Sequence, residues 1–81
     1  MSDVFSLNGM ALPDIIRTNL ANHLAHLGRA TDVLALALAL ERAEGFVEDI
    51  QAARALTPAT VEGLFIALDV AASMRRRELA P

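Results

Sequence analysis

The middle of the chain is apolar in a two-residue alternation that nevertheless predicts a helix. Residues 33–40 read V-L-A-L-A-L-A-L. Leu and Ala are among the strongest helix formers, so residue propensity outweighs the strand-like alternation. A helix turns by about 100° per residue, which places Leu36 and Leu40 on one face. Leu34 and Leu38 then lie on the opposite face. Because a helix that is apolar on all sides has to be covered on all sides, this segment predicts self-association or a protein partner.

The helix that contains this segment is predicted to run over 32–56, with Thr31 or Asp32 as its N-cap. Its main apolar stripe has the three- and four-residue spacing of a helix face and comprises Val33, Leu36, Leu40, Ala43, Val47 and Ile50. Beyond Leu40 a wide polar face follows, made of Glu41, Arg42, Glu44, Glu48, Asp49 and Gln51. We therefore expect the first half of this helix to be covered on all sides and the second half to be amphipathic.

An earlier helix is predicted over 13–27. Pro13 suits the first turn of a helix, and Asp14 complements its positive end. The apolar stripe comprises Ile16, Leu20, Leu24 and Leu27. Gly28 follows the last of these residues and is expected to provide a left-handed C-cap.

The last helix is predicted over 58–78. Thr57 provides the N-cap and Pro58 the first helical position, which makes this the clearest boundary in the chain. The apolar stripe comprises Val61, Leu64, Ala67, Leu68, Ala71 and Met74, widened by Phe65 and Ala72. The polar residues that face away are Glu62, Asp69, Ser73, Arg76 and Arg77.

Residues 1–12 lack helical periodicity. The sequence Leu7-Asn8-Gly9-Met10 is a two-residue hairpin signal, because Asn and Gly tolerate the positive φ of a type I′ turn. Two interpretations stay open for this segment: a short hairpin or extended arm docked on the helices, and a flexible tail.

Together these segments predict an all-α fold: a small three-helix protein with a short extended N-terminal arm. Short connections make the helices antiparallel neighbours within a single helical domain over 13–81. The chain has 81 residues and is 54% hydrophobic, which is more apolar side chain than one small core uses. We therefore expect a two-fold homodimer that forms a larger helical bundle. Leu34 and Leu38 are the predicted intersubunit residues, because Leu36 and Leu40 continue the stripe that the core of the monomer would use.

Charge and composition restrict the partners. The net charge is −3, with seven Arg and no Lys, which argues against nucleic acid and anionic membrane surfaces as partners. The absence of cysteine excludes disulfides and thiolate metal sites. The eight-residue apolar run is far shorter than the roughly 20 residues that span a bilayer. No signal-peptide pattern is present, and the cytoplasm is the expected location. Arg without Lys, together with many Ala, favours a GC-rich bacterial or phage genome.

The chain offers little for catalysis or metal binding. His23 and His26 are three residues apart, but the local sequence supplies no third ligand. The glutamates after Leu40 have a spacing that can build a di-iron site in a helical bundle, but the Glu-x-x-His motif that such sites need is absent. No nucleophile motif or phosphate-binding loop is present. We therefore predict a non-enzymatic protein without catalytic residues, metal ligands or cofactor.

The function expected from these observations is regulation or inhibition by protein binding, as in a bacterial or phage accessory protein that blocks or modulates a host protein. An acidic face made of Glu44, Glu48 and Asp49 would meet a basic partner surface. Phe65 and Ile66 would provide an apolar anchor, since such residues dominate interfaces. The partner would be another protein whose identity the sequence does not specify.

Two alternatives remain. Residues 55–64 could form the turn of a helix-turn-helix, with Arg75–Arg77 touching DNA phosphates. Against this, Ala59, Thr60 and Glu62 occupy the positions that would enter the major groove, where Arg, Lys, Asn or Gln normally read the bases. The other alternative is a structural unit whose apolar excess serves only self-assembly.

Overall fold

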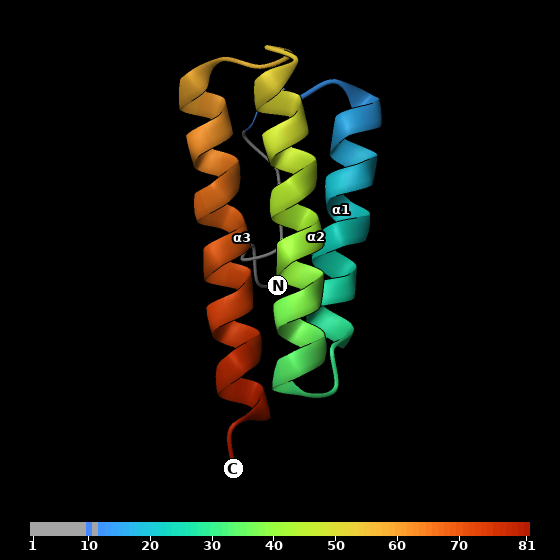
Figure 1. Ribbon diagram of the computed structural model, residues 1–81, viewed down its shortest axis with the longest axis vertical. Coiled ribbons are helices and arrows are strands. Elements are labelled where there is room, and N and C mark those ends of the chain that lie inside the picture. Colours follow the sequence, from blue (N-terminus) through green and yellow to red (C-terminus); the bar gives the residue numbers. More distant parts are fainter. Residues whose placement is uncertain (1–9, 11) are drawn as a thin grey trace.

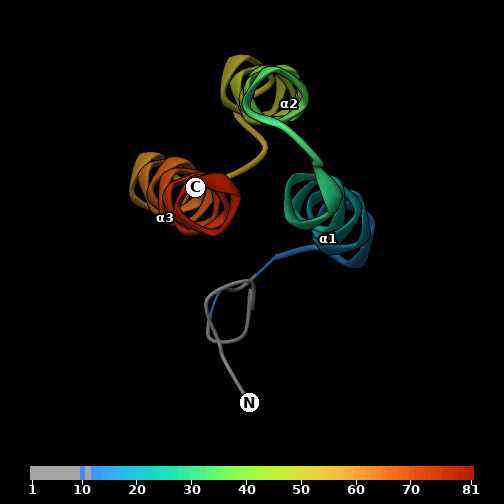
Figure 2. The same cartoon turned by 90° about the horizontal axis from the view of Figure 1, so that it is seen from below.

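The computed structural model describes residues 10 and 12–81, which form three α-helices packed against one another (Figure 1). Their bounds are Asp14–Arg29 for α1, Val33–Ala52 for α2 and Pro58–Leu79 for α3. Consecutive helices run in opposite directions, and in the end-on view the three occupy the corners of a triangle (Figure 2). The predicted all-α fold with three packed helices is confirmed. The predicted arm or hairpin lies outside the described residues, except for Met10 and Leu12.

Local side-chain chemistry explains where α2 and α3 begin. The Asp32 carboxylate accepts a hydrogen bond from the backbone N–H of Ala35 at 2.7 Å. The Thr57 hydroxyl accepts one from the N–H of Thr60 at 3.2 Å, with Pro58 at the first helical position. Each side chain satisfies a backbone donor that has no partner inside the helix. Both predicted N-caps are confirmed.

The end of α1 differs from the prediction. The helix continues through Gly28 and ends at Arg29, so the predicted cap at Gly28 is wrong. Ala30 leaves the helix in an extended conformation, with φ −59° and ψ 131°, and its N–H donates to the carbonyl of Leu27 at 3.3 Å. Because the chain exits through an extended residue, no left-handed residue is needed at this end.

Helix α2 ends before the predicted boundary at residue 56, through a left-handed residue that is not glycine. The N–H of Ala55 donates to the carbonyl of Ile50 at 3.2 Å, and the N–H of Arg54 donates to Gln51 at 3.1 Å. These two bonds form a Schellman motif. Arg54 occupies the left-handed position with φ 55°. The predicted end at residue 56 is therefore too late, because no Gly or Asn marks this left-handed position in the sequence.

The core lies between the three helices and contains most of the predicted stripes. The fully buried large side chains are Leu20, Leu27, Leu36, Val47, Leu64 and Leu68. Val33 was predicted to join the α2 stripe, but it is 56% exposed. This prediction is wrong because Val33 is the first residue of α2, and the start of α2 lies at an end of the bundle (Figure 1).

Candidate protein-binding surfaces

One apolar surface lies on α2 near its first residue. Leu34 is 81% exposed and Leu38 is 49% exposed, whereas Leu36 between them is fully buried. Ala37 is exposed beside them. We call Leu34, Ala37 and Leu38 the α2 patch. A shallow groove at this patch is bordered by Asp32 and Glu41. The two leucines predicted for the intersubunit face therefore lie on the outside of the bundle, uncovered by the chain's own helices.

A second apolar surface lies on α3. Ile66 is 56% exposed, and Val70, one helical turn later, is 44% exposed. With the half-buried Met74 they line a shallow groove, and we call these three residues the α3 patch. Asp69 and Arg77 also line this groove. Ile66 is one of the residues predicted for partner binding, whereas Val70 is not, although its four-residue spacing from Ile66 places it on the same helix face.

Phe65 and the acidic residues predicted for partner binding do not join the α3 patch. Phe65 is half-buried and packs against the core. The groove at Ile66 is lined by α3 residues alone. Glu44 is half-buried and Glu48 is exposed, both on α2. Asp49, also on α2, is exposed. The residues that line the two grooves thus form two separate surfaces, one on each helix.

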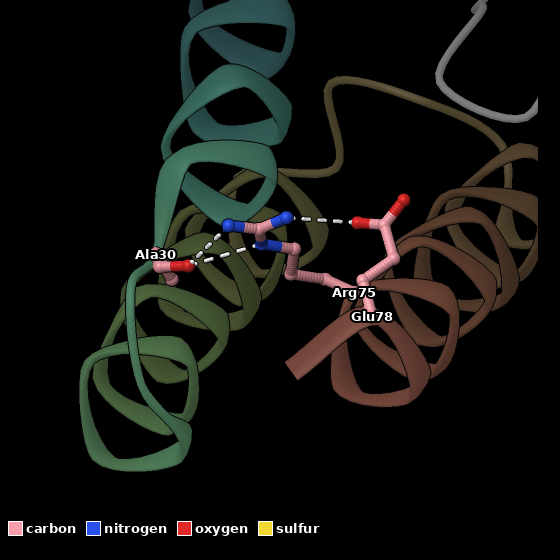
Figure 3. Close-up of polar contacts among 3 residues, drawn as sticks. All are labelled: Ala30, Arg75 and Glu78. Atoms are coloured by element: carbon pink, nitrogen blue, oxygen red, sulfur yellow. Dashed lines mark hydrogen bonds and ion pairs between the residues drawn. The ribbon is translucent and has the colours of Figure 1, made fainter. Parts of the chain in front are cut away.

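Arg75 has a structural role in the bundle. Its guanidinium donates to the Ala30 carbonyl oxygen from Nε at 3.0 Å and from Nη2 at 2.8 Å (Figure 3). Nη1 donates to Glu78 Oε1 at 2.9 Å. The side chain thus links α3 to the α1–α2 connection. Of the three consecutive arginines, Arg76 and Arg77 have exposed side chains. Nucleic-acid binding through this run would therefore lack one of its three predicted contacts.

His23 packs against another helix. Its ring lies 5.3 Å from the ring of Phe46 on α2, measured between centroids. Burial lowers the pKa of His23 below its ordinary value, and the nearby His26 lowers it further. His26 Nδ1 donates to the Asn22 carbonyl at 2.8 Å. Within residues 10 and 12–81, no three His, Asp or Glu side chains gather where they could hold a metal ion. The arrangement favours a packing role for His23.

Comparisons with known protein families, with characterised proteins and with solved structures found no match for this chain. In the part of the chain that the structure describes, no helix combines the length and apolar character needed to cross a membrane. The candidate sites are therefore the α2 patch and the α3 patch, judged on their own geometry.

Proposed function

We propose that this protein acts by binding other protein chains, as a small regulatory or inhibitory protein without enzymatic activity. The observation that carries the proposal is the presence, among the described residues, of two exposed apolar patches outside the buried core. Scattered exposed apolar residues are ordinary on protein surfaces. Here they are paired one helical turn apart on two different helices, which is the arrangement of interface anchors. The setting proposed is the cytoplasm, where a domain without disulfides is usual.

The α2 patch is the proposed homodimer contact. Leu34 has the greatest exposed fraction among the large apolar side chains of the described residues. A two-fold dimer covers the same patch on both copies, so Leu34 and Leu38 of each chain become buried against those of the other. The larger helical bundle expected from the sequence would form in this way.

The α3 patch is the proposed site for a different protein. Ile66 and Val70 give an apolar centre, and Asp69 and Arg77 give charges of both signs at its border. A partner helix with an apolar stripe would fit such a surface. The bound protein would then be inhibited because α3 covers the surface through which that protein acts.

The dimer is tested by measuring molar mass with light scattering from about 1 to 200 µM, a span that brackets a micromolar Kd. We expect the wild-type mass to rise toward twice the chain mass, and Leu34→Glu to stay monomeric at equal helicity. The matched control is Thr18→Glu, an exposed position on α1. A Leu34→Glu variant with the wild-type mass profile would show that the dimer does not use this patch.

The partner site is tested with tagged wild-type protein and tagged Ile66→Asp as baits in bacterial lysate. A protein retained in stoichiometric amount by the wild type and lost by Ile66→Asp supports the proposal. Glu62→Asp, an exposed position on the same helix, should retain that protein. If every retained protein binds both baits equally, the α3 patch is not the binding site. If the wild-type protein dimerises but retains no other protein from the lysate, the result favours a structural unit that only self-assembles.

A further inference from the structure

Helix α2 carries an excess of negative charge. From Asp32 to Ala52 the chain has five acidic residues and one arginine, which gives this segment a net charge of −4, against −3 for the whole chain. In the end-on view α2 occupies one corner of the triangle, so its outer side faces away from α1 and α3 (Figure 2). The exposed charged residues of this helix are Glu41, Arg42, Glu48 and Asp49. The negative charge of the protein is therefore concentrated on α2.

Acidic residues border the α2 patch and continue beyond it. Among the described residues, Asp32 and Glu41 are the charged residues that line the groove at this patch. Positions three and four residues apart lie on one side of a helix, so the row that begins in the α2 patch continues through Glu41 and Gly45 to Glu48. At 1.5 Å per residue, this row extends for about 21 Å from Leu34 to Glu48. A second helix lying along it would contact apolar residues in one half and acidic residues in the other.

Gly45 leaves room for a second helix along this row. A Cβ added at Gly45 would meet no atom of a neighbouring helix within 4 Å, so the packing of the bundle does not require glycine at this position. Glycine inside a helix is less favourable than alanine. Because Gly45 has no side chain, the backbone of a second helix can lie closer to α2 between Glu41 and Glu48.

A second copy is a poor match for the charges around the α2 patch. A two-fold dimer brings the same patch to the contact from both chains, so Asp32 and Glu41 of both copies surround the same leucines. With Arg42 counted, each copy still contributes a net negative charge, and like charges at a contact weaken association. The patch also buries far less than the roughly 1,000 Å² of a stable specific interface. We therefore expect the proposed dimer to be weak and a partner of opposite charge to bind α2 more tightly.

We infer that α2 docks a basic amphipathic helix of another protein, and that this helix displaces the second copy from the α2 patch. The apolar side chains of the docked helix cover Leu34 and Leu38, and its Lys or Arg side chains pair with Glu41 and Glu48. The row on α2 corresponds to about four turns of such a helix. The displacement rests on the proposed dimer, and through it the partner determines whether the protein is a monomer or a dimer.

A designed peptide tests the docking. The probe is a fluorescein-labelled helical peptide of about 18 residues, with Leu at helical spacing and Lys on the flanks of the apolar stripe. A matched peptide carries Glu in place of each Lys. We expect fluorescence anisotropy to show binding of the basic peptide and at least about tenfold weaker binding of the acidic one. A basic peptide that binds no more tightly than the acidic one would overturn the docking.

Variants of α2 locate the contact. Glu41→Gln combined with Glu48→Gln should weaken binding of the basic peptide about tenfold at low salt, because two attractive pairs are lost. Leu34→Ala should weaken it by about the same factor through the loss of apolar contact. The matched control combines Thr18→Lys with Asn22→Lys, which makes the same change in net charge at exposed positions on α1 and should change the Kd by less than about threefold. Equal weakening by this control, or no effect of Leu34→Ala, contradicts docking on α2.

Light scattering tests the displacement. A saturating amount of the basic peptide should convert the wild-type dimer into a complex of one chain and one peptide. Raising the salt concentration from about 0.05 to 0.5 M should weaken the peptide complex and strengthen the dimer, because screening removes an attraction in one and a repulsion in the other. A dimer that stays intact with the peptide bound would overturn the displacement. A wild type that is monomeric without peptide would overturn the proposed dimer as well, whereas the docking on α2 is decided by the peptide binding alone.

Discussion

Arg75 of α3 and the backbone carbonyl of Ala30 are joined by two hydrogen bonds, at 3.0 and 2.8 Å. Ala30 follows the last residue of α1, and the carbonyl groups at a helix end have no partner inside the helix. One guanidinium therefore satisfies a helix end and joins it to the third helix. Its remaining nitrogen pairs with Glu78, which holds the side chain in this orientation.

Replacing Arg75 with Met should destabilise the bundle. Met preserves much of the aliphatic stem but removes the donors, which leaves the Ala30 carbonyl with no partner from α3. We expect the free energy of unfolding in urea to fall by about 1–2 kcal/mol, since hydrogen bonds from a charged donor contribute more than neutral ones. Arg77→Met, on the exposed side of α3, should change it by about 0.5 kcal/mol or less. Equal losses in both variants would contradict the structural role of Arg75.

Replacing Arg54 with Gly should stabilise the protein. Arg54 holds a left-handed conformation with φ 55°, which is unfavourable for a residue with a Cβ. Glycine adopts this conformation freely, and we expect a gain of about 0.5–1 kcal/mol in the free energy of unfolding. Arg42→Gly, at an exposed position inside α2, should instead lose about 1 kcal/mol. A loss of stability in both variants would show that the conformation of Arg54 is not strained.

Caps show which parts of the fold are readable from sequence. Asp32 and Thr57 act on backbone groups three residues away, so a short stretch of sequence contains the whole interaction. The helix ends were harder to predict. Gly28 continued the helix and Arg54 provided the left-handed residue, because the exit of the chain is set by where the next helix packs.

Long-range contacts could not be read in the same way. Ala30 and Arg75 are 45 positions apart, and only the packing of α3 beside the end of α1 brings them together. The position of Leu34 and Leu38 on the face opposite Leu36 follows from helical periodicity, so the sequence alone predicts it. The α3 patch was predicted only in part. Ile66 was predicted as an apolar anchor, and Val70, one helical turn later on the same face, was not.

Protonation of His23 should destabilise the folded protein. Burial and the neighbouring His26 lower the pKa of His23 in the folded state, whereas the unfolded chain has the ordinary value of about 6.5. The unfolded state therefore binds the proton more readily, and stability falls as the pH decreases through about 6.5 toward the folded pKa. Urea unfolding at pH 7.5, 6.5 and 5.5 would measure this fall.

Two variants separate the causes of that pH dependence. His23→Gln should remove the part of the fall that this imidazole contributes, so its stability should change less between pH 7.5 and 5.5. His26→Gln should retain most of the fall, because burial is the larger cause of the shift at His23. A wild-type pH profile in His23→Gln would show that other groups produce the dependence.

Leu34 and Leu36 are two residues apart on α2 and provide a matched pair for separating folding from association. Leu36 is fully buried, so Leu36→Ala should cost about 2–5 kcal/mol in the free energy of unfolding at any protein concentration. Leu34 is 81% exposed, so at low concentration Leu34→Ala should change this free energy by about 0.5 kcal/mol or less. At concentrations above the dimer Kd, association adds to wild-type stability, and the difference between the wild type and Leu34→Ala should grow. Thermal unfolding at about 1 and 200 µM, on either side of a micromolar Kd, would measure this difference. A difference that stays the same at both concentrations would mean that Leu34 remains exposed in solution and takes no part in association.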